Sequence, residues 1–176
     1  VEAEEKIHRM ARFDALSGLP KRTYFKDLVR SIIQKSPLES YAAFFVIDID
    51  DFKHVNDSFG HPVGDELLCR LADRINLISG PDTCFSRFGG DEFVGMLAGF
   101  ETAADAETAA RQTLMSLAGT YEVASQSLAV TISSGIVINR SHAFDLQQMM
   151  IKSDLALYES KVRGKGISTL FAEAMD

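Results

Sequence analysis

The feature that most constrains this chain is an apolar run of strand length, YAAFFVIDI at residues 41–49. Until Asp48 the run is apolar at both alternating sets of positions, which differs from the one-sided pattern of a strand that faces water. Such a run predicts a central strand covered on both faces. The chain therefore has to build a sheet around this segment.

Hydrophobic periodicity divides the rest of the chain into helices and further strands. We expect helices at 1–13, after residue 20, from residue 64, at 102–116 and at 145–161, and strands at 83–88, 93–97, 128–137 and 167–171. Thr102 with Asp105 resembles the capping pair of a helix start. The order predicts an α/β fold (an α+β sandwich), with helices packed on a central mixed sheet.

Composition narrows the class of protein. The net charge is −7 over 176 residues, which argues against a nucleic-acid footprint but leaves room for a small anionic ligand with a metal. No apolar run approaches the roughly 20 residues of a membrane span, and no signal peptide is recognisable. Cys69 and Cys84 are interpreted as buried thiols of a reducing compartment, so we expect a cytoplasmic domain without direct membrane contact.

An acidic segment follows the apolar strand. Asp48 and Asp50 alternate along the chain, which places them on the same side, and the sequence then turns polar towards Asn56. Ligands in such folds bind where strands end. Carboxylates without His or Cys suit Mg²⁺ or Mn²⁺ rather than zinc. Taken alone, the same pattern is also typical of a solvated turn.

A second segment, RFGGDEF at 87–93, joins the two predicted hairpin strands. Gly89 and Gly90 permit a tight turn and a close approach to a ligand, and they hold Asp91 and Glu92 at its tip. If the hairpin pairs beside the strand at 41–49, Asp91 and Asp48 face one cation together. A plain hairpin turn remains the alternative. Likewise, lysines near the end of the helix at 145–161 also fit a surface role at a helix C-terminus.

Together these segments resemble the GGDEF domain family of diguanylate cyclases. The motifs that carry the resemblance are DALSGLPKR at 14–22, FKHVND at 52–57, GHPVGD at 60–65, RFGGDEF at 87–93, SSG at 133–135, ALYESK at 156–161 and GK at 164–165. The resemblance implies a sheet wrapped by helices, like a nucleotidyl cyclase or polymerase palm core. It also implies a division into an N-terminal signalling helix at 1–13, a GGDEF domain at 14–171 and the start of a linker at 172–176.

The resemblance further implies a role for each matching position. Mg²⁺ (or Mn²⁺) would be held by Asp48, Asp91 and the backbone carbonyl of Ile49. Guanine would be read by Asn56 and Asp65, with His61 lining the pocket. The remaining substrate contacts would come from Phe52, Lys53, Gly89, Gly90, Lys161 and Lys165, and catalysis would involve Asp91, Glu92 and Lys53.

The implied reaction joins two GTP molecules into cyclic di-GMP and releases two pyrophosphates. Each domain would hold one GTP, so the working unit would be a homodimer. The implied partners are an upstream sensor domain and a downstream EAL phosphodiesterase domain. The alternatives are a catalytically silent GTP-binding domain that controls such a phosphodiesterase and, less in keeping with the motifs, a dimerisation unit without nucleotide.

Two departures from the family pattern bear on function. The Arg-x-x-Asp inhibitory motif is replaced by Gly80-Pro81-Asp82-Thr83, so we expect no feedback inhibition through that site. Lys165 stands where Arg is usual, which keeps the charge but loses the bidentate fork. Neither departure removes an implied metal or guanine contact.

Overall fold

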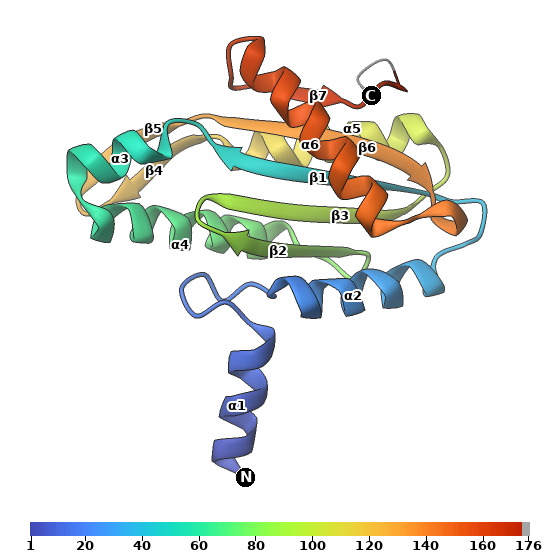
Figure 1. The fold of residues 1–176 in the computed structure, drawn as a ribbon, viewed down its shortest axis with the longest axis horizontal. Helices are drawn as coiled ribbons and strands as arrows, with labels where there is room; N and C mark the ends of the chain where they lie inside the picture. The colour runs from blue at the N-terminus through green and yellow to red at the C-terminus, as the bar shows by residue number, and fades with distance from the viewer. Residues whose placement is uncertain (174–176) are drawn as a thin grey trace.

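The computed structural model describes residues 1–173 and shows a five-stranded sheet between helices (Figure 1). The helices are α1 (Glu2–Arg12), α2 (Arg22–Lys35), α3 (Phe52–Phe59), α4 (His61–Ile78), α5 (Ala103–Leu117) and α6 (Leu146–Val162), with a 3₁₀ turn at Ser141–Ala143. The strands are β1 (Tyr41–Ile49), β2 (Thr83–Gly89), β3 (Glu92–Phe100), β4 (Gly119–Val123), β5 (Gln126–Val130), β6 (Ile132–Arg140) and β7 (Ser168–Leu170). The expected fold class, a central mixed sheet flanked by helices, is confirmed.

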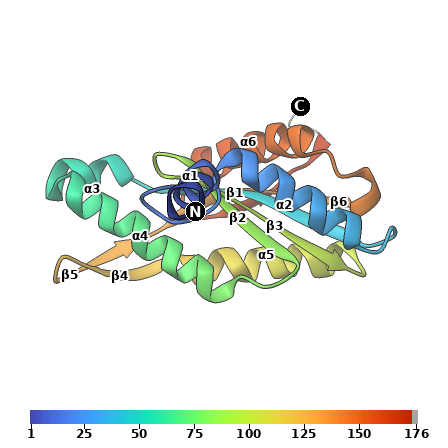
Figure 2. The same cartoon turned by 90° about the horizontal axis from the view of Figure 1, so that it is seen from below.

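The apolar run forms the centre of the sheet, as predicted. The strand order is β2-β3-β1-β6-β7; β1 is antiparallel to both β3 and β6, and β7 is added parallel to β6. Alternating residues of β1 enter two separate cores. Phe45 and Ile47 pack towards α4 and α5, whereas Phe44 and Val46 pack towards α2 and α6. Figure 2 shows these helix pairs on opposite sides of the sheet.

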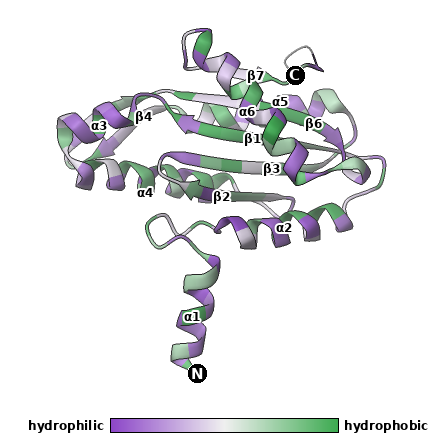
Figure 3. Cartoon of the chain, viewed as in Figure 1, coloured by the Kyte–Doolittle hydropathy of each residue, from purple (hydrophilic) through white to green (hydrophobic). Residues whose placement is uncertain are grey.

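Hydropathy follows this layering. Hydrophobic and hydrophilic positions alternate along α2 and α4, and β1 is largely hydrophobic until its C-terminal end turns polar beside α3 (Figure 3). That polar end is where the expected site residues begin. No helix within residues 1–173 is long and apolar enough to cross a membrane.

The first helix, α1, stands away from the body (Figure 1) and has no buried residue. Its apolar stripe, Ile7 and Met10, is exposed. It contacts the domain through the loop at 13–21, where Lys21 Nζ donates to Met10 O (2.8 Å) and Lys21 N donates to Arg12 O (2.7 Å). It also contacts α2 directly, because the Arg12 guanidinium lies 5.2 Å from the centre of the Tyr24 ring. The predicted helix at 1–13 is thus present, one residue shorter at either end. The proposed linker at 172–176 falls partly on 174–176, outside the described residues.

Three local predictions were wrong. The expected single strand at 128–137 is two strands in different sheets: β5 pairs with β4, whereas from Thr131, whose carbonyl accepts from Asp50 N (3.0 Å), the chain pairs with the end of β1. The hairpin β4–β5 was missed because its turn uses Ala124 and Ser125 at positive φ instead of the usual Gly or Asn. The helix expected from Gly64 begins at His61, since Pro62 is tolerated in a first helical turn.

Two smaller differences concern α3 and the cysteines. The polar segment after Asp51 forms α3, an unpredicted helix whose Phe52 and Val55 pack against the main core. Cys84 is buried as expected, and burial raises the pKa of its thiol to about 12. Cys69 is only partly buried, so the prediction of two buried thiols holds for Cys84 alone.

Candidate active site at the end of strand β1

Strand register brings the two acidic segments together. Asp48, near the end of β1, lies opposite Glu92 at the start of β3 and opposite Ser133 on β6. Directly opposed residues of an antiparallel pair point to the same face. The GGDEF hairpin therefore pairs beside β1, which is the arrangement on which the expected Asp48–Asp91 site depended.

Asp91 lies in the turn between β2 and β3, close to Asp48. Burial, a side-chain hydrogen bond with Asp48 and the negative charge of Asp48 together raise the pKa of Asp91 to about 6, and nearby Lys161 offsets part of this. The pKa of Glu92 is also raised, first by burial and then by the charges of Asp154 and Asp48. Carboxylates held this close favour a shared proton or a cation between them.

The oxygen atoms of the Asp48–Asp91 pair are suitable ligands for a divalent cation. Two carboxylate groups and a neighbouring backbone carbonyl are hard oxygen ligands of the kind that Mg²⁺ takes, and Mg²⁺ keeps several waters or phosphate oxygens as its other ligands. Within residues 1–173, no cluster of three or more His, Cys, Asp and Glu side chains is arranged to hold a metal. A Mg²⁺ ion at this place would therefore need ligands from water or substrate.

Lys161 in the last turn of α6 and Lys165 in the loop that follows reach the same edge. Lys161 Nζ forms an ion pair with Asp48, and Lys165 Nζ donates to Asp51 Oδ1 at 2.8 Å. Both lysines thus lie beside the acidic segment, from positions more than a hundred residues further along the chain. This placement favours a role at the site over that of lysines which merely complement the end of a helix.

Asp50 is engaged differently from Asp48. Its carboxylate accepts from Thr131 Oγ1 (2.7 Å), Ser133 Oγ (2.6 Å) and the backbone N–H of Gly166 (2.9 Å). Ser133 also lies opposite Asp48, so the two aspartates share a side of the sheet, as the alternation predicted. Asp50 fastens β6 and the loop after α6 to the end of β1 and does not join the Asp48–Asp91 pair.

The corner between α3 and α4 contains the expected base-binding residues. Asn56 is half-buried on α3, and its Oδ1 is a buried acceptor without a hydrogen-bond partner within residues 1–173. Gly64 of α4 packs directly against it, because a Cβ built on Gly64 would lie 1.8 Å from Asn56 Oδ1 and 3.2 Å from the ring of Phe52. The corner thus presents an unsatisfied acceptor, and a ligand with an N–H donor would satisfy it.

The other expected residues surround this corner. Asp65 and His61 are exposed on the first turns of α4, and Lys53 is exposed on the first turn of α3. In the described part of the chain, no hydrogen bond or ion pair joins Lys53 or His61 to another expected site residue. The structure therefore brings together the carboxylates, Lys161 and Lys165 at one place and the base-binding residues at the adjacent corner, but it gives Lys53 no direct contact with the carboxylates.

Sequence reasoning missed three groups near the site. The charge of Asp154 on α6 raises the pKa of Glu92, and the charge of Arg22 on α2 lowers it. Both residues also line a groove of about 700 Å³ between those helices. Arg87 belongs to the RFGGDEF motif and has no expected role there, yet it contacts both Asp14 and Gly90. Only its position two residues before the first glycine of the turn could have indicated a role.

Comparison with known proteins agrees with this geometry. A sequence profile of the family described as "Diguanylate cyclase, GGDEF domain" matches residues 11–166. Signaling protein YkoW of Bacillus subtilis is 32% identical over 93% of this chain and 21% of its own length. The bifunctional diguanylate cyclase/cyclic di-GMP phosphodiesterase MucR of Pseudomonas aeruginosa is 31% identical over 99% of this chain and 25% of its own length.

A solved structure gives the same fold. The GGDEF domain of PA1120 (TpbB or YfiN) from Pseudomonas aeruginosa superimposes with a TM-score of 0.82 at 28% identity, covering 93% of this chain and 96% of that one. The present chain spans about a quarter or less of the curated relatives named above, so it corresponds to one part of those proteins.

Proposed function

Because the chain belongs to the GGDEF diguanylate cyclase domain family, we propose that it binds GTP with Mg²⁺ and condenses two GTP molecules into cyclic di-GMP. The observation that supports this most strongly is the Asp48–Asp91 carboxylate pair, formed where β1 and the GGDEF turn meet and bordered by Lys161. We place this activity in the cytoplasm and assign it to a homodimer, with one GTP held by each domain.

The carboxylates and lysines divide the phosphate chemistry between them. Asp48, Asp91 and the carbonyl of Ile49 would hold Mg²⁺, which when bound lowers the pKa of a hydroxyl and offsets charge on the phosphates. Lys161 and Lys165 would meet the β- and γ-phosphates, exchanging their present carboxylate partners for phosphate oxygens. Backbone N–H groups at Phe52 and Lys53 would bind the same phosphates.

The reaction is an in-line nucleotidyl transfer. The 3′-hydroxyl oxygen of one GTP bonds to the α-phosphorus of the other, and the bond to pyrophosphate breaks. We assign Asp91 to accept the hydroxyl proton, with Glu92 beside it as a supporting carboxylate. A second transfer in the opposite direction closes the ring and releases the second pyrophosphate.

Guanine selection is assigned to the corner between α3 and α4. The unpaired Oδ1 of Asn56 would accept a hydrogen bond from the guanine edge, and the carboxylate of Asp65 would accept from its other N–H groups, with His61 alongside. Adenine offers a different donor pattern on that edge, so these residues favour GTP over ATP.

We expect Gly64→Ala to weaken GTP binding about 10- to 100-fold, because the new methyl group would occupy the place of Asn56 Oδ1 and turn that side chain away. The fold should persist, since the clashing atom ends a flexible side chain and alanine favours a helix. Calorimetric titration with GTP and with ITP, which lacks the guanine 2-amino group, measures this. Unchanged GTP affinity, with GTP still preferred over ITP, would contradict the base-binding role of this corner.

The proposed function is tested by incubating the purified chain with GTP and Mg²⁺ and separating nucleotides by chromatography. The assay is repeated with the chain fused to a coiled coil that forces a dimer. Cyclic di-GMP from either form supports the cyclase. GTP binding without product from the forced dimer would instead favour the silent regulatory domain. The relative MucR is named for both a cyclase and a phosphodiesterase activity, so its name supports the pairing with a phosphodiesterase but not a silent cyclase.

A further inference from the structure

The loop between α1 and α2 is fastened to the catalytic body at several points. Leu19 is buried in the main core, and the carbonyl of Pro20 accepts from Ser86 Oγ (2.7 Å) and from the backbone N–H of Arg87 (3.3 Å), both on β2. Cys69 Sγ of α4 donates to the carbonyl of Leu16 (3.2 Å). The helix α1 buries nothing of its own, and besides the contact of Arg12 with the ring of Tyr24 on α2, this loop links its position to the domain.

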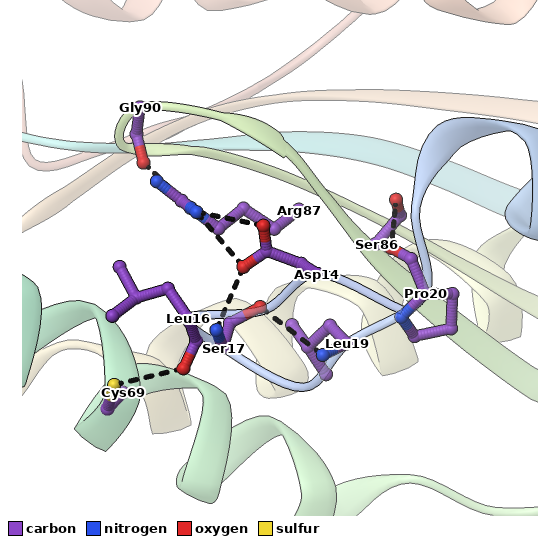
Figure 4. A network of polar contacts seen from close by, with 9 residues as sticks. All are labelled: Asp14, Leu16, Ser17, Leu19, Pro20, Cys69, Ser86, Arg87 and Gly90. Atoms are coloured by element: carbon purple, nitrogen blue, oxygen red, sulfur yellow. Dashed lines mark hydrogen bonds and ion pairs between the residues drawn. The ribbon is translucent and has the colours of Figure 1, made fainter. Parts of the chain in front are cut away.

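Arg87 spans the space between this loop and the GGDEF turn (Figure 4). Its Nη1 donates to both carboxylate oxygens of Asp14, at 3.1 and 3.0 Å, and its Nε donates to the carbonyl of Gly90 at 3.0 Å. The side chains of Arg87 and Asp14 are only 13% and 20% exposed. One rigid guanidinium therefore joins the loop at Asp14 to the turn at Gly90, although Asp14 and Arg87 are 73 residues apart in the chain.

Asp14 is itself held in place by hydrogen bonds within its own loop. Its Oδ2 accepts from the backbone N–H of Ser17 at 2.8 Å, and its backbone N–H donates to the carbonyl of Leu19 at 2.7 Å. Burial acts to raise the pKa of Asp14, but the hydrogen bonds from Ser17 and Arg87 outweigh it and the pKa is lowered. Asp14 is thus a fixed, charged anchor for the guanidinium.

The other end of the contact is the residue before Asp91. Gly90 has φ +53°, and its carbonyl belongs to the peptide that leads directly into Asp91. A hydrogen bond to that carbonyl restrains the orientation of the peptide, and with it the direction in which the Asp91 side chain leaves the backbone. Within residues 1–173, the side-chain donor to this carbonyl is Arg87 Nε.

We propose that Arg87 is a positioning residue that transmits the placement of the α1–α2 loop, through Asp14, to the peptide of Gly90, and so sets Asp91 against Asp48. This inference rests on the proposed function, because it concerns the same carboxylates. It adds a physical connection between α1, which lies outside the body, and the reacting carboxylate. A displacement of about 1 Å at a catalytic group is enough to cost about 100-fold in rate.

The connection is tested with Arg87→Lys and Asp14→Asn, made in the forced dimer. Lysine keeps the positive charge but cannot donate to Asp14 and to Gly90 through one planar fork. The matched control is Arg111→Lys. Arg111 also joins a carboxylate, Glu107 (Nε, 3.0 Å), to a backbone carbonyl, that of Ser168 (Nη1, 2.9 Å), but it lies on α5 away from the carboxylate pair.

Two readouts separate positioning from folding. The first is the kinetics of cyclic di-GMP formation, for which we expect Arg87→Lys to lower kcat about 10- to 100-fold with the KM for GTP changed less than about threefold. The second does not depend on activity: Mn²⁺ affinity is measured by electron paramagnetic resonance with a non-reactive α,β-methylene GTP analogue. We expect Arg87→Lys to lower the Mn²⁺ affinity about tenfold. We also expect the variant with both substitutions to bind Mn²⁺ no more weakly than the more severe single variant, because Arg87 and Asp14 act through the same contact.

A purely structural role would give a different pattern. Arg87→Lys would then lower the thermal midpoint as Arg111→Lys does, with kcat and Mn²⁺ affinity within twofold of the wild type, and this result overturns the proposal. Asp14→Asn keeps the test decisive if Arg87→Lys does not fold. A wild-type chain that makes no product but binds Mn²⁺ through Asp91 refutes the cyclase alone, while the Mn²⁺ readout still tests Arg87. If the chain shows no Mn²⁺ binding that depends on Asp91, both the cyclase proposal and the proposed role of Arg87 are overturned.

Discussion

Asp91→Asn is expected to lower the rate of cyclic di-GMP formation by more than about 10⁴-fold, since general-base catalysis alone contributes about 10²–10⁴-fold and the substitution also removes a metal ligand. Asparagine has nearly the same shape, so the turn after Gly90 should keep its conformation. The rate is measured with the forced dimer at saturating GTP and Mg²⁺.

The same variant should be more stable than the wild type when metal is absent. Burial first, and then the hydrogen bond with Asp48 and the negative charge of Asp48, raise the pKa of Asp91 to about 6, so the ionised pair is unfavourable in the fold. Removal of one charge relieves this repulsion by on the order of 1 kcal/mol, a small value because Asp91 is only half-buried and water screens the charges. Thermal unfolding in EDTA measures the difference, and Mg²⁺ should narrow it by stabilising the wild type.

A matched control is Asp73→Asn, which removes a carboxylate that is 66% exposed and lies on α4, away from the site. It should change neither turnover nor stability beyond about 0.5 kcal/mol. Turnover of Asp91→Asn within tenfold of the wild type would remove Asp91 from the catalytic role and would leave the carboxylate pair as a structural feature.

The second large effect is expected for stability. Gly135→Ala should destabilise the fold by about 3 kcal/mol or more, at the upper end of what overpacking costs. A Cβ on Gly135 would lie 2.0 Å from the carbonyl oxygen of Ser153 and 2.5 Å from the backbone nitrogen of Leu157. Both atoms belong to the backbone of α6, so no side chain can move aside and the whole helix would have to shift from β6.

Urea unfolding followed by circular dichroism measures this loss. The control is Gly80→Ala, because a Cβ at Gly80 would meet nothing within 4 Å. It should remain within about 0.5 kcal/mol of the wild type. A Gly135→Ala protein within 1 kcal/mol of the wild type would show that α6 can move away from β6 at little cost. Since Lys161 is part of α6, it would also weaken the view that this helix holds its lysine in a fixed place.

The parts of the structure that were predictable are those with a local signal. The apolar run of β1 has a single interpretation, and the glycines at 89 and 90 mark the turn that brings Asp91 beside Asp48. The β4–β5 turn carried no such mark, because Ala124 and Ser125 rarely adopt positive φ. The end of β5 at Val130 could not be predicted for a related reason. The alternation of apolar and polar residues continues from Val130 through Thr131 to Ile132, although Val130 and Ile132 belong to different sheets.

Contacts between distant segments were beyond reach for a different reason. The pairing of Asp14 with Arg87 depends on how the loop before α2 crosses β2, and neither residue is unusual in its local sequence. The unpaired Oδ1 of Asn56 likewise becomes visible only when α4 packs on α3 through Gly64. A single sequence lists the groups of such a site, but their burial and distances follow from tertiary packing.

The central position of β1 has a consequence for how the chain acquires its fold. Phe44 of β1 pairs with Met96 on one side and with Val137 on the other. The ribosome therefore synthesises this most apolar strand well before the two strands that pair with it. Such non-local pairing is slow, and an apolar strand with open edges is prone to associate with other chains in the meantime. During synthesis, β1 cannot be enclosed on both edges until the segment near residue 140 has left the ribosome. We therefore expect refolding yield to fall steeply with protein concentration, and translation past β6 to be the step that commits a nascent chain to its native sheet.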